Sequence, residues 1–159
     1  MPVPPGHGLI KVVDVDVEIR RYTEPTTGFQ YDVTVMKLKL ENGRRFLMSN
    51  IPLEIVEAIS VMKNAINIPR RQSLFLFLMS NEEFRETIIR NIKEVVIDEI
   101  DRRTGLYTAS LVLEGDGFNL TIKMIPSHAV FIALLAGKPI YVSEELVNEA
   151  GFEEEEEFE

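Results

Sequence analysis

Residues 118–142, FNLTIKMIPSHAVFIALLAGKPIYV, carry the clearest structural signal in this chain, because the hydrophobic period changes twice within them. Alternation over Phe118 to Met124 predicts a strand. The stretch Pro126 to Gly137 predicts an apolar helix, since proline is favoured at the first helical position and glycine just after the last. Pro139 prevents the helix from continuing, and Ile140 to Val142 is typical of a short strand.

Small residues recur on one face of the predicted helix. We expect this face to pack against the sheet, because small side chains let a helix and a strand approach closely. The residues concerned are Ala129, Ile132, Ala133 and Ala136.

Two further strands are expected before this segment, over Lys93 to Ile100 and Leu106 to Glu114, with a turn at Asp101 to Gly105 between them. After it, Ser143 is expected to cap a last helix that ends near Gly151.

The first third of the chain is predicted to be an antiparallel meander. Alternation marks strands at Lys11 to Arg20 and Tyr31 to Leu40, and Asn42-Gly43 forms a hairpin turn that returns the chain through Arg45 to Met48. The apolar face of the first strand is expected to hold Val13, Val15, Val17 and Ile19.

A helix is expected next, with a cap at Ser49-Asn50 and an early proline, Pro52. Its apolar stripe is predicted to consist of Ile55, Ile59, Met62 and Ile66.

The run Ser73 to Met79 is continuously apolar, which predicts either a fully buried strand or an insertion packed on a partner. We expect part of it at a subunit interface, and therefore a homo-oligomer. Ser80 to Glu83 fits a capping box that starts a helix running to about Asn91.

Strands that run in groups, without strict β-α-β alternation, predict an α+β fold with mostly antiparallel strands and helices packed on the sheet. We expect one compact domain at residues 11–151, a flexible N-terminus at 1–10, and an acidic disordered tail at 152–159.

Composition excludes several classes of protein. The chain has 159 residues and no cysteine, which rules out disulfide scaffolds, cysteine nucleophiles and thiolate metal sites. No apolar stretch is long enough to span a bilayer and the first residues do not resemble a signal peptide, so no membrane association and a cytoplasmic location are expected.

The formal net charge is −9, and the tail after Gly151 holds six of the 26 acidic residues, which leaves 20 against 17 basic residues in the body. A nearly neutral body has no broad basic footprint for nucleic acid. The tail is predicted to be a solubilising segment, and self-inhibition or competition with a polyanionic ligand is the alternative.

Generic motifs do not identify a function. The sequence lacks a Walker A loop, a dinucleotide-binding glycine fingerprint, a nucleophile elbow and a His-Glu-x-x-His zinc motif. His128 beside Ser127 is a poor candidate for a catalytic triad, because sequence neighbours seldom point at each other.

The segment Ile125 to Gly151, with its Pro-Ser-x-Ala, Gly-x-Pro-Ile and Val-Ser-Glu-Glu elements, resembles the signature of the bifunctional nuclease domain family. Val95 to Ile100 and Tyr107 to Leu113 are similar to the two strands that precede it in the family. Leu53 to Ile66, followed by Ile68-Pro-Arg, is similar to the family's first helix and the element after it.

The resemblance implies a self-associating α+β domain that cuts DNA and RNA. The family has an arginine where this chain has Ile125, an aspartate at His128 and an acidic residue at Lys123. Two functions therefore stay open: a nuclease, and a catalytically silent homo-oligomeric binding or assembly module on the same fold.

For a metal-free nuclease, the candidate catalytic residues are His128 as general acid or base, Ser127 with helix N-terminal amides as phosphate ligands, and Lys123 as the neutralising charge. The alternative is that His128 is a solvent-facing first-turn residue, Lys123 a solvated strand residue and Ser127 a cap.

A metal-dependent nuclease is expected to use Mg²⁺ or Mn²⁺ on carboxylates. The available carboxylates are Glu54, Glu57, Asp98, Glu99 and Asp101.

The candidate nucleic-acid-binding residues are the loop arginines Arg70, Arg71, Arg102 and Arg103, for which surface solubility is the alternative. Asp14, Asp16 and Glu18 share a strand face, which either binds a hard cation or is a solvated edge.

Overall fold

The computed structural model describes residues 8–150, so residues 1–7 and the acidic tail lie outside the described part. In chain order the elements are β1 (Leu9–Thr23), β2 (Gln30–Leu40), β3 (Arg45–Ser49), α1 (Leu53–Met62), α2 (Leu74–Ser80), α3 (Glu82–Asn91), β4 (Ile92–Asp101), β5 (Leu106–Gly115), β6 (Phe118–Met124), α4 (Pro126–Ala136), β7 (Ile140–Ser143) and α5 (Glu144–Ala150).

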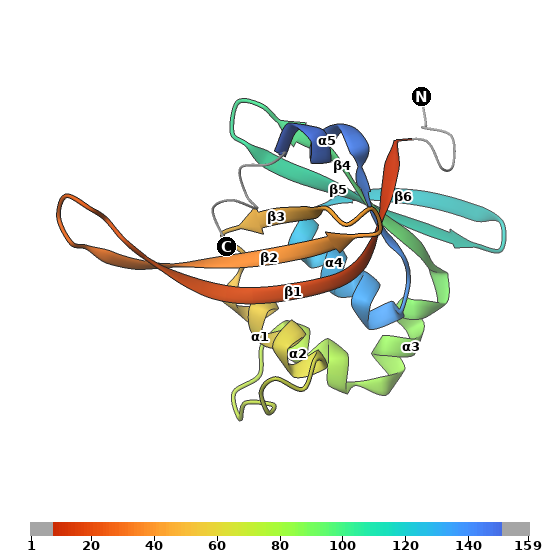
Figure 1. Ribbon diagram of the computed structural model, residues 1–159. Coiled ribbons are helices and arrows are strands. Elements are labelled where there is room, and N and C mark those ends of the chain that lie inside the picture. Colours follow the sequence, from red (N-terminus) through yellow and green to blue (C-terminus); the bar gives the residue numbers. More distant parts are fainter. Residues whose placement is uncertain (1–7, 151–159) are drawn as a thin grey trace.

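The seven strands form one sheet in the order β3-β2-β1-β7-β4-β5-β6 (Figure 1). All neighbouring strands are antiparallel except β4 and β7, which are parallel. The α+β class, the mostly antiparallel sheet and the single compact domain predicted from the sequence are confirmed. The sequence did not indicate that β7 lies in the centre of the sheet.

Strand β1 joins the two halves of the sheet. Leu9 to Lys11 pair with β7, and the strand pairs with β2 from Val12 onward. A register shift lies between Val12 and Asp14 at the crossing point. Because the bulge turns Val13 outward, that residue is 61% exposed, and the prediction that Val13 lies on the apolar face is wrong.

Helix α4 packs on β4 and β5 as expected. Ala129 and Ala133 are fully buried, and Ile132 and Ala136 are partly buried against the same core. Gly137 ends the helix in the left-handed region with φ 66°, where glycine has no Cβ penalty. The core also takes in Val130 and Phe131, so the helix is buried over more than its small-residue face.

Helix α1 is shorter than predicted. It begins after Pro52, which has no side-chain cap, so the expected cap at Ser49-Asn50 is wrong. The helix ends at Met62, and Asn64 follows in the left-handed region with φ 59°. Ile66 is therefore exposed, and its place on the apolar stripe is also wrong.

The run Leu74 to Met79 is helical, so the expected buried strand is wrong. Leucine, phenylalanine and methionine are not β-branched, and the Ser73 hydroxyl accepts a hydrogen bond from the Leu76 amide as an N-cap. Ser80 belongs to the end of α2, where its hydroxyl donates to the Leu76 carbonyl.

The N-cap of α3 is Asn81, one residue after the predicted cap, and its side chain accepts from the Phe84 amide. In residues 8–150, no helix has both the length and the apolar composition to cross a membrane.

Candidate functional site

A polar cluster lies on β4, β5 and β6 of the sheet. The Lys123 ammonium donates to the Ser110 hydroxyl at 2.8 Å and lies 3.2 Å from the Glu99 carboxylate. It is also 3.9 Å from Asp98, whose carboxylate accepts from the Ser110 hydroxyl at 3.1 Å. We call Asp98, Glu99, Ser110 and Lys123 the β4–β6 cluster.

Strand pairing explains why these side chains meet. Ser110 lies directly opposite Lys123 on β6, so the two side chains share a face. On β4 the register shifts between Ile97 and Glu99, which inserts one extra residue. The shift allows the consecutive residues Asp98 and Glu99 to reach the same ammonium, although strict alternation would send them to opposite faces.

The environment of the cluster is mixed. Ser110 is only 4% exposed, whereas Lys123 and Glu99 are more than half exposed. Burial raises the pKa of the Asp98 carboxyl above its ordinary value, while the charge of Lys123 and the Ser110 hydrogen bond act in the opposite direction. The Asp98 side chain is 33% exposed, and its carboxylate gains from the nearby positive charge.

Ser127 and His128 lie in the first turn of α4. Ser127 is 3% exposed, so its hydroxyl is not presented to solvent. The His128 ring is half-buried and packs edge-on against Phe75 of α2, with ring centroids 5.2 Å apart. The environment of His128 is thus an aromatic contact between helices.

The structure does not bring Lys123 together with Ser127 and His128. Ala109 and Leu111 of β5 face the core that contains α4, and Ser110 between them points to the opposite face, where it binds Lys123. The sheet therefore separates the Lys123 side chain from the helix that carries His128.

The arginines of the β4–β5 turn differ from each other. Arg102 forms two hydrogen bonds to Glu149 of α5, at 2.6 and 3.1 Å, and these hold its pKa above the usual value. Arg103 makes no side-chain ion pair in the described part of the chain and is exposed. Of the two, Arg103 has the free guanidinium.

Arg70 and Arg71 are exposed in the loop between α1 and α2. Arg71 lines an open cavity of about 420 Å³ together with Glu54 and Glu57 of α1. These carboxylates are far from β4 in the sequence and take no part in the β4–β6 cluster. Asp101 accepts from the amides of Arg103 and Thr104 and so shapes the turn.

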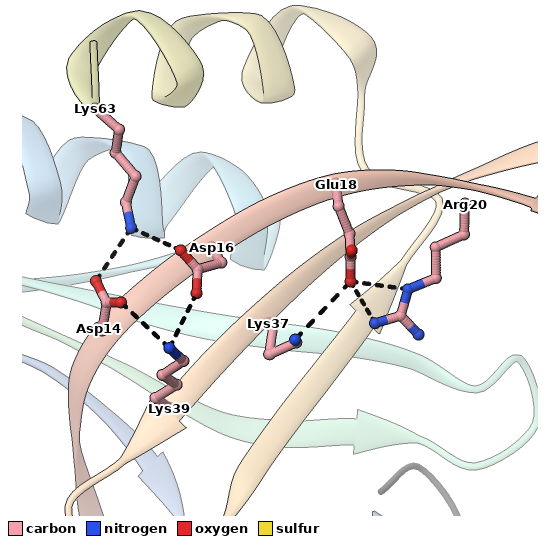
Figure 2. A network of polar contacts seen from close by, with 7 residues as sticks. All are labelled: Asp14, Asp16, Glu18, Arg20, Lys37, Lys39 and Lys63. Carbon is pink, nitrogen blue, oxygen red and sulfur yellow. Dashed lines mark hydrogen bonds and ion pairs between the residues drawn. The ribbon is translucent and has the colours of Figure 1, made fainter. Parts of the chain in front are cut away.

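The carboxylates of β1 are paired with basic side chains (Figure 2). Asp14 and Asp16 lie between Lys63, the residue after α1, at 3.1 and 2.9 Å, and Lys39 of β2, at 3.8 and 3.4 Å. The hydrogen bond from Lys63 lowers the pKa of Asp16. Glu18 contacts Arg20 and, at 4.0 Å, Lys37. This face is a network of ion pairs, and its carboxylates are already neutralised.

Residues 8–150 contain no group of three or more aspartate, glutamate or histidine side chains arranged to hold a metal ion. Magnesium is usually held by one or two carboxylates, with phosphate oxygens and waters completing the shell. Asp98 and Glu99, both within 4 Å of one ammonium, are a donor pair of this kind.

Sequence reasoning did not identify Ser110 as a site residue. A serine between Ala109 and Leu111 looks like an ordinary polar residue on the outer face of a strand. Its role depends on the β5–β6 register, for which the short Gly115-Asp116-Gly117 turn was the only available signal.

Comparisons with known proteins identify the family. The bifunctional nuclease domain model matches residues 36–155. Two Mycobacterium tuberculosis proteins, named Uncharacterized protein Rv1829 in strain H37Rv and Uncharacterized protein MT1877 in strain CDC 1551, are each 30% identical over 120 residues. The alignment covers 74% of this chain and 66% of each relative, just under two thirds of their length. The match includes every strand of the β4–β6 cluster and all of α4, and the chain belongs to the bifunctional nuclease domain family.

Proposed function

We propose that this protein hydrolyses phosphodiester bonds of DNA or RNA, and that the β4–β6 cluster is the reacting centre. The observation that carries the proposal is the convergence of two carboxylates and one lysine on a single face of the sheet, within the region that matches a nuclease domain. Phosphodiester hydrolysis requires an activated water and stabilisation of charge on the phosphoryl oxygens, and these residue types supply both.

Asp98 and Glu99 would hold Mg²⁺ or Mn²⁺, which when bound lowers the pKa of a water and neutralises phosphate charge. Lys123 now occupies the space beside both carboxylates. When a phosphate enters, its ammonium is in position to pair with a phosphoryl oxygen. Ser110 donates to Asp98 and orients that carboxylate.

The residues Ser127 and His128 offer a second, metal-free route for the same function. His128 would act as general acid or base there, with Ser127 and the first-turn amides of α4 near the phosphate. The edge-on contact with Phe75 and the burial of Ser127 disfavour this route relative to the β4–β6 cluster.

Among the arginines, Arg103 and the loop residues Arg70 and Arg71 would contact phosphates outside the reacting centre. Arg102 would first have to leave Glu149. The cytoplasmic location expected from the sequence stays a prediction.

The test is cleavage of labelled single- and double-stranded DNA and RNA by the purified protein, with Mg²⁺, with Mn²⁺ and with a chelator. We expect metal-dependent cleavage that Lys123→Ala lowers by roughly 100- to 1,000-fold, the usual effect of removing one charge-stabilising group. His128→Ala is expected to keep its activity. Chelator-resistant cleavage that is lost in His128→Ala would support the metal-free route instead.

An assembly module is the second candidate function, favoured by an unprotected sheet edge. Phe118, Leu120 and Ile122 of edge strand β6 are between 42% and 51% exposed, and the β5–β6 pairing is free of bulges. Edge strands in monomers usually carry prolines, bulges or inward charges that prevent pairing with another chain. If none of the four substrates is cleaved, the assembly module replaces the nuclease as the proposed function.

A further inference from the structure

We infer that the cleft between β1, α4 and the 137–139 loop binds a phosphate-bearing ligand of the nucleotide class. The cleft has a volume of about 400 Å³, within the range of small-molecule sites. It is separate from the β4–β6 cluster in its residues. The inference concerns binding only, so it does not depend on whether the chain cuts nucleic acid.

The architecture of the sheet creates this cleft. Strand β1 pairs with β7 only through Leu9 to Lys11 and then turns toward β2 at the bulge. The end of α4, closed by Gly137, faces the gap that this divergence leaves.

Lysines give the cleft its charge. Lys11, Lys63 and Lys138 line it, against a single lining carboxylate, Asp14. Asp14 is already shared between Lys63 and Lys39, as Figure 2 shows. Within the described residues, neither Lys11 nor Lys138 forms an ion pair. Two lysines without an ion pair thus lie in one cleft, and the carboxylate next to Lys11 is that of Glu41, which accepts a hydrogen bond from the Lys11 backbone amide at 3.3 Å.

The lining is also apolar. Val13 is turned outward by the bulge, and Leu134, Pro139 and Tyr141 contribute further apolar surface. A ligand that fits both features carries a compact anion at one end and a flat or apolar body at the other. A nucleoside phosphate has this form, and lysine is a common ligand of phosphate.

Of the residues that line the cleft, Lys11 and Tyr141 lie in one cross-strand row with Ser110 and Lys123 of the β4–β6 cluster, whereas α4 lines the cleft from the opposite face of the sheet. Lys11 pairs with Tyr141, Tyr141 with Val96, Val96 with Ser110, and Ser110 with Lys123. Side chains on one such row point the same way. Four strand spacings, or roughly 19 Å, separate Lys11 from Lys123. The ligand phosphate has two possible sources, a free nucleotide or the end of a nucleic-acid strand.

A lysine beside a helix C-terminus also offsets the negative end of the helix dipole. Lys138 has this position after α4, and its amide donates to the Ala133 carbonyl. A purely dipolar role predicts no ligand binding, and titration with a ligand separates the two roles.

The experiment is isothermal titration calorimetry of the full chain in low salt, without divalent metal. The probes are adenosine monophosphate, adenosine and inorganic phosphate. We expect saturable binding of the nucleotide, with adenosine and phosphate each weaker, because each offers only half of the contacts. A short oligonucleotide with a terminal phosphate, compared with the same strand ending in a hydroxyl, tells a strand end from a free nucleotide as the source.

The Lys11→Gln, Lys138→Gln double variant is expected to bind adenosine monophosphate at least about 10-fold more weakly. Lys93→Gln is the matched control, since Lys93 of β4 forms an ion pair with Glu114 of β5 and does not line the cleft. Lys138→Gln alone serves if the double variant unfolds below the temperature of the titration. Absence of saturable nucleotide binding, or equal binding by the wild type and the double variant, would overturn the assignment.

Discussion

The core around Ala133 leaves no space for a larger side chain. Ala133 is fully buried where α4 packs on the sheet, so Ala133→Phe must displace its neighbours. We expect the free energy of unfolding to fall by about 1 to 3 kcal/mol. Ala65→Phe, at an exposed position after α1, is the control. An unchanged melting temperature for Ala133→Phe would show that the α4 face is not packed as described.

The lowered pKa of Asp16 makes the stability of the folded protein depend on pH. The folded-state pKa of Asp16 is lowered chiefly by the hydrogen bond from Lys63. Because the pKa of Asp16 is lower in the folded protein than its unfolded value of 3.8, the ionised carboxylate stabilises the folded protein at pH values above 3.8. This contribution is lost as the pH falls through the folded-state pKa. Lys63→Met should therefore cost about 0.2 to 1 kcal/mol at neutral pH, as for other exposed pairs.

That difference between Lys63→Met and the wild type should vanish once Asp16 is protonated in both. Urea unfolding at neutral pH and at a pH below the folded pKa measures it. A difference of the same size at both pH values would mean that Lys63 acts through packing of its side-chain stem.

At the scale of single elements, α2 depends on its cap. Ser73→Ala removes the acceptor for the Leu76 amide and is expected to cost about 0.5 to 2 kcal/mol. Hydrogen exchange of the α2 amides should speed up more than exchange in α4. Ser73→Asp keeps a capping oxygen and should restore protection, and failure to do so would mean that the cap is not the stabilising contact.

Helix α5 is tied to the β4–β5 turn by Arg102 and Glu149. Glu149→Gln weakens this charged contact and should raise the exchange rate of the α5 amides. Glu144→Gln, in the same helix but without an ion pair to any residue of 8–150, is the control. Equal exchange in both variants would mean that the buried Leu146 and Val147, with the hydrogen bonds from Arg44 to Val147 and Asn148, hold α5 in place without Glu149.

Elements with strong local signals were predictable from the sequence, and elements set by tertiary pairing were not. Proline, glycine and period located α4 and β5–β6 to within a residue or two. The run Leu74 to Met79 has no helical or strand period, so its helix depends on Ser73 and on packing of Phe75 against Phe131. Bulges are not visible in a single sequence, which is why Val13 was misplaced.

The same limit applies to the candidate site. Asp98, Glu99 and Lys123 were recognisable as charged residues of chemically useful types. Their convergence depends on the extra residue in β4 and on the β5–β6 register, both of which are properties of the folded sheet. His128 was a candidate because of its residue type at the start of a predicted helix. Only the structure shows that the sheet separates it from Lys123.

At the scale of the whole molecule, the exposed apolar row of β6 predicts self-association. Leu74 and Phe77 of α2 are exposed as well, and they belong to the apolar run from which the sequence predicts a subunit interface. The homo-oligomer stays a prediction. Leu120→Lys, on the apolar face of β6, should shift the molecular mass measured by light scattering toward the monomer. Thr121→Lys, on the opposite face of the same strand, is the control. A wild-type monomer at micromolar concentration would refute the prediction.

Net charge predicts weak, salt-sensitive binding of nucleic acid. Few phosphates are neutralised at once, so log K against log salt concentration should have a slope of roughly −2 to −4. Removing residues 152–159 deletes six carboxylates and should strengthen binding at low salt. An unchanged affinity after truncation would show that the tail is too far from the bound strand to repel it.

The role of the β4–β6 cluster as the reacting centre is tested most directly by the rate of metal-dependent cleavage by Asp98→Asn, which keeps the shape of the side chain and removes its charge. We expect a loss of at least about 100-fold relative to the wild type. Glu114→Gln, a charge change on β5 outside the β4–β6 cluster, should cleave like the wild type. Cleavage by Asp98→Asn at the wild-type rate would show that the reacting centre lies elsewhere.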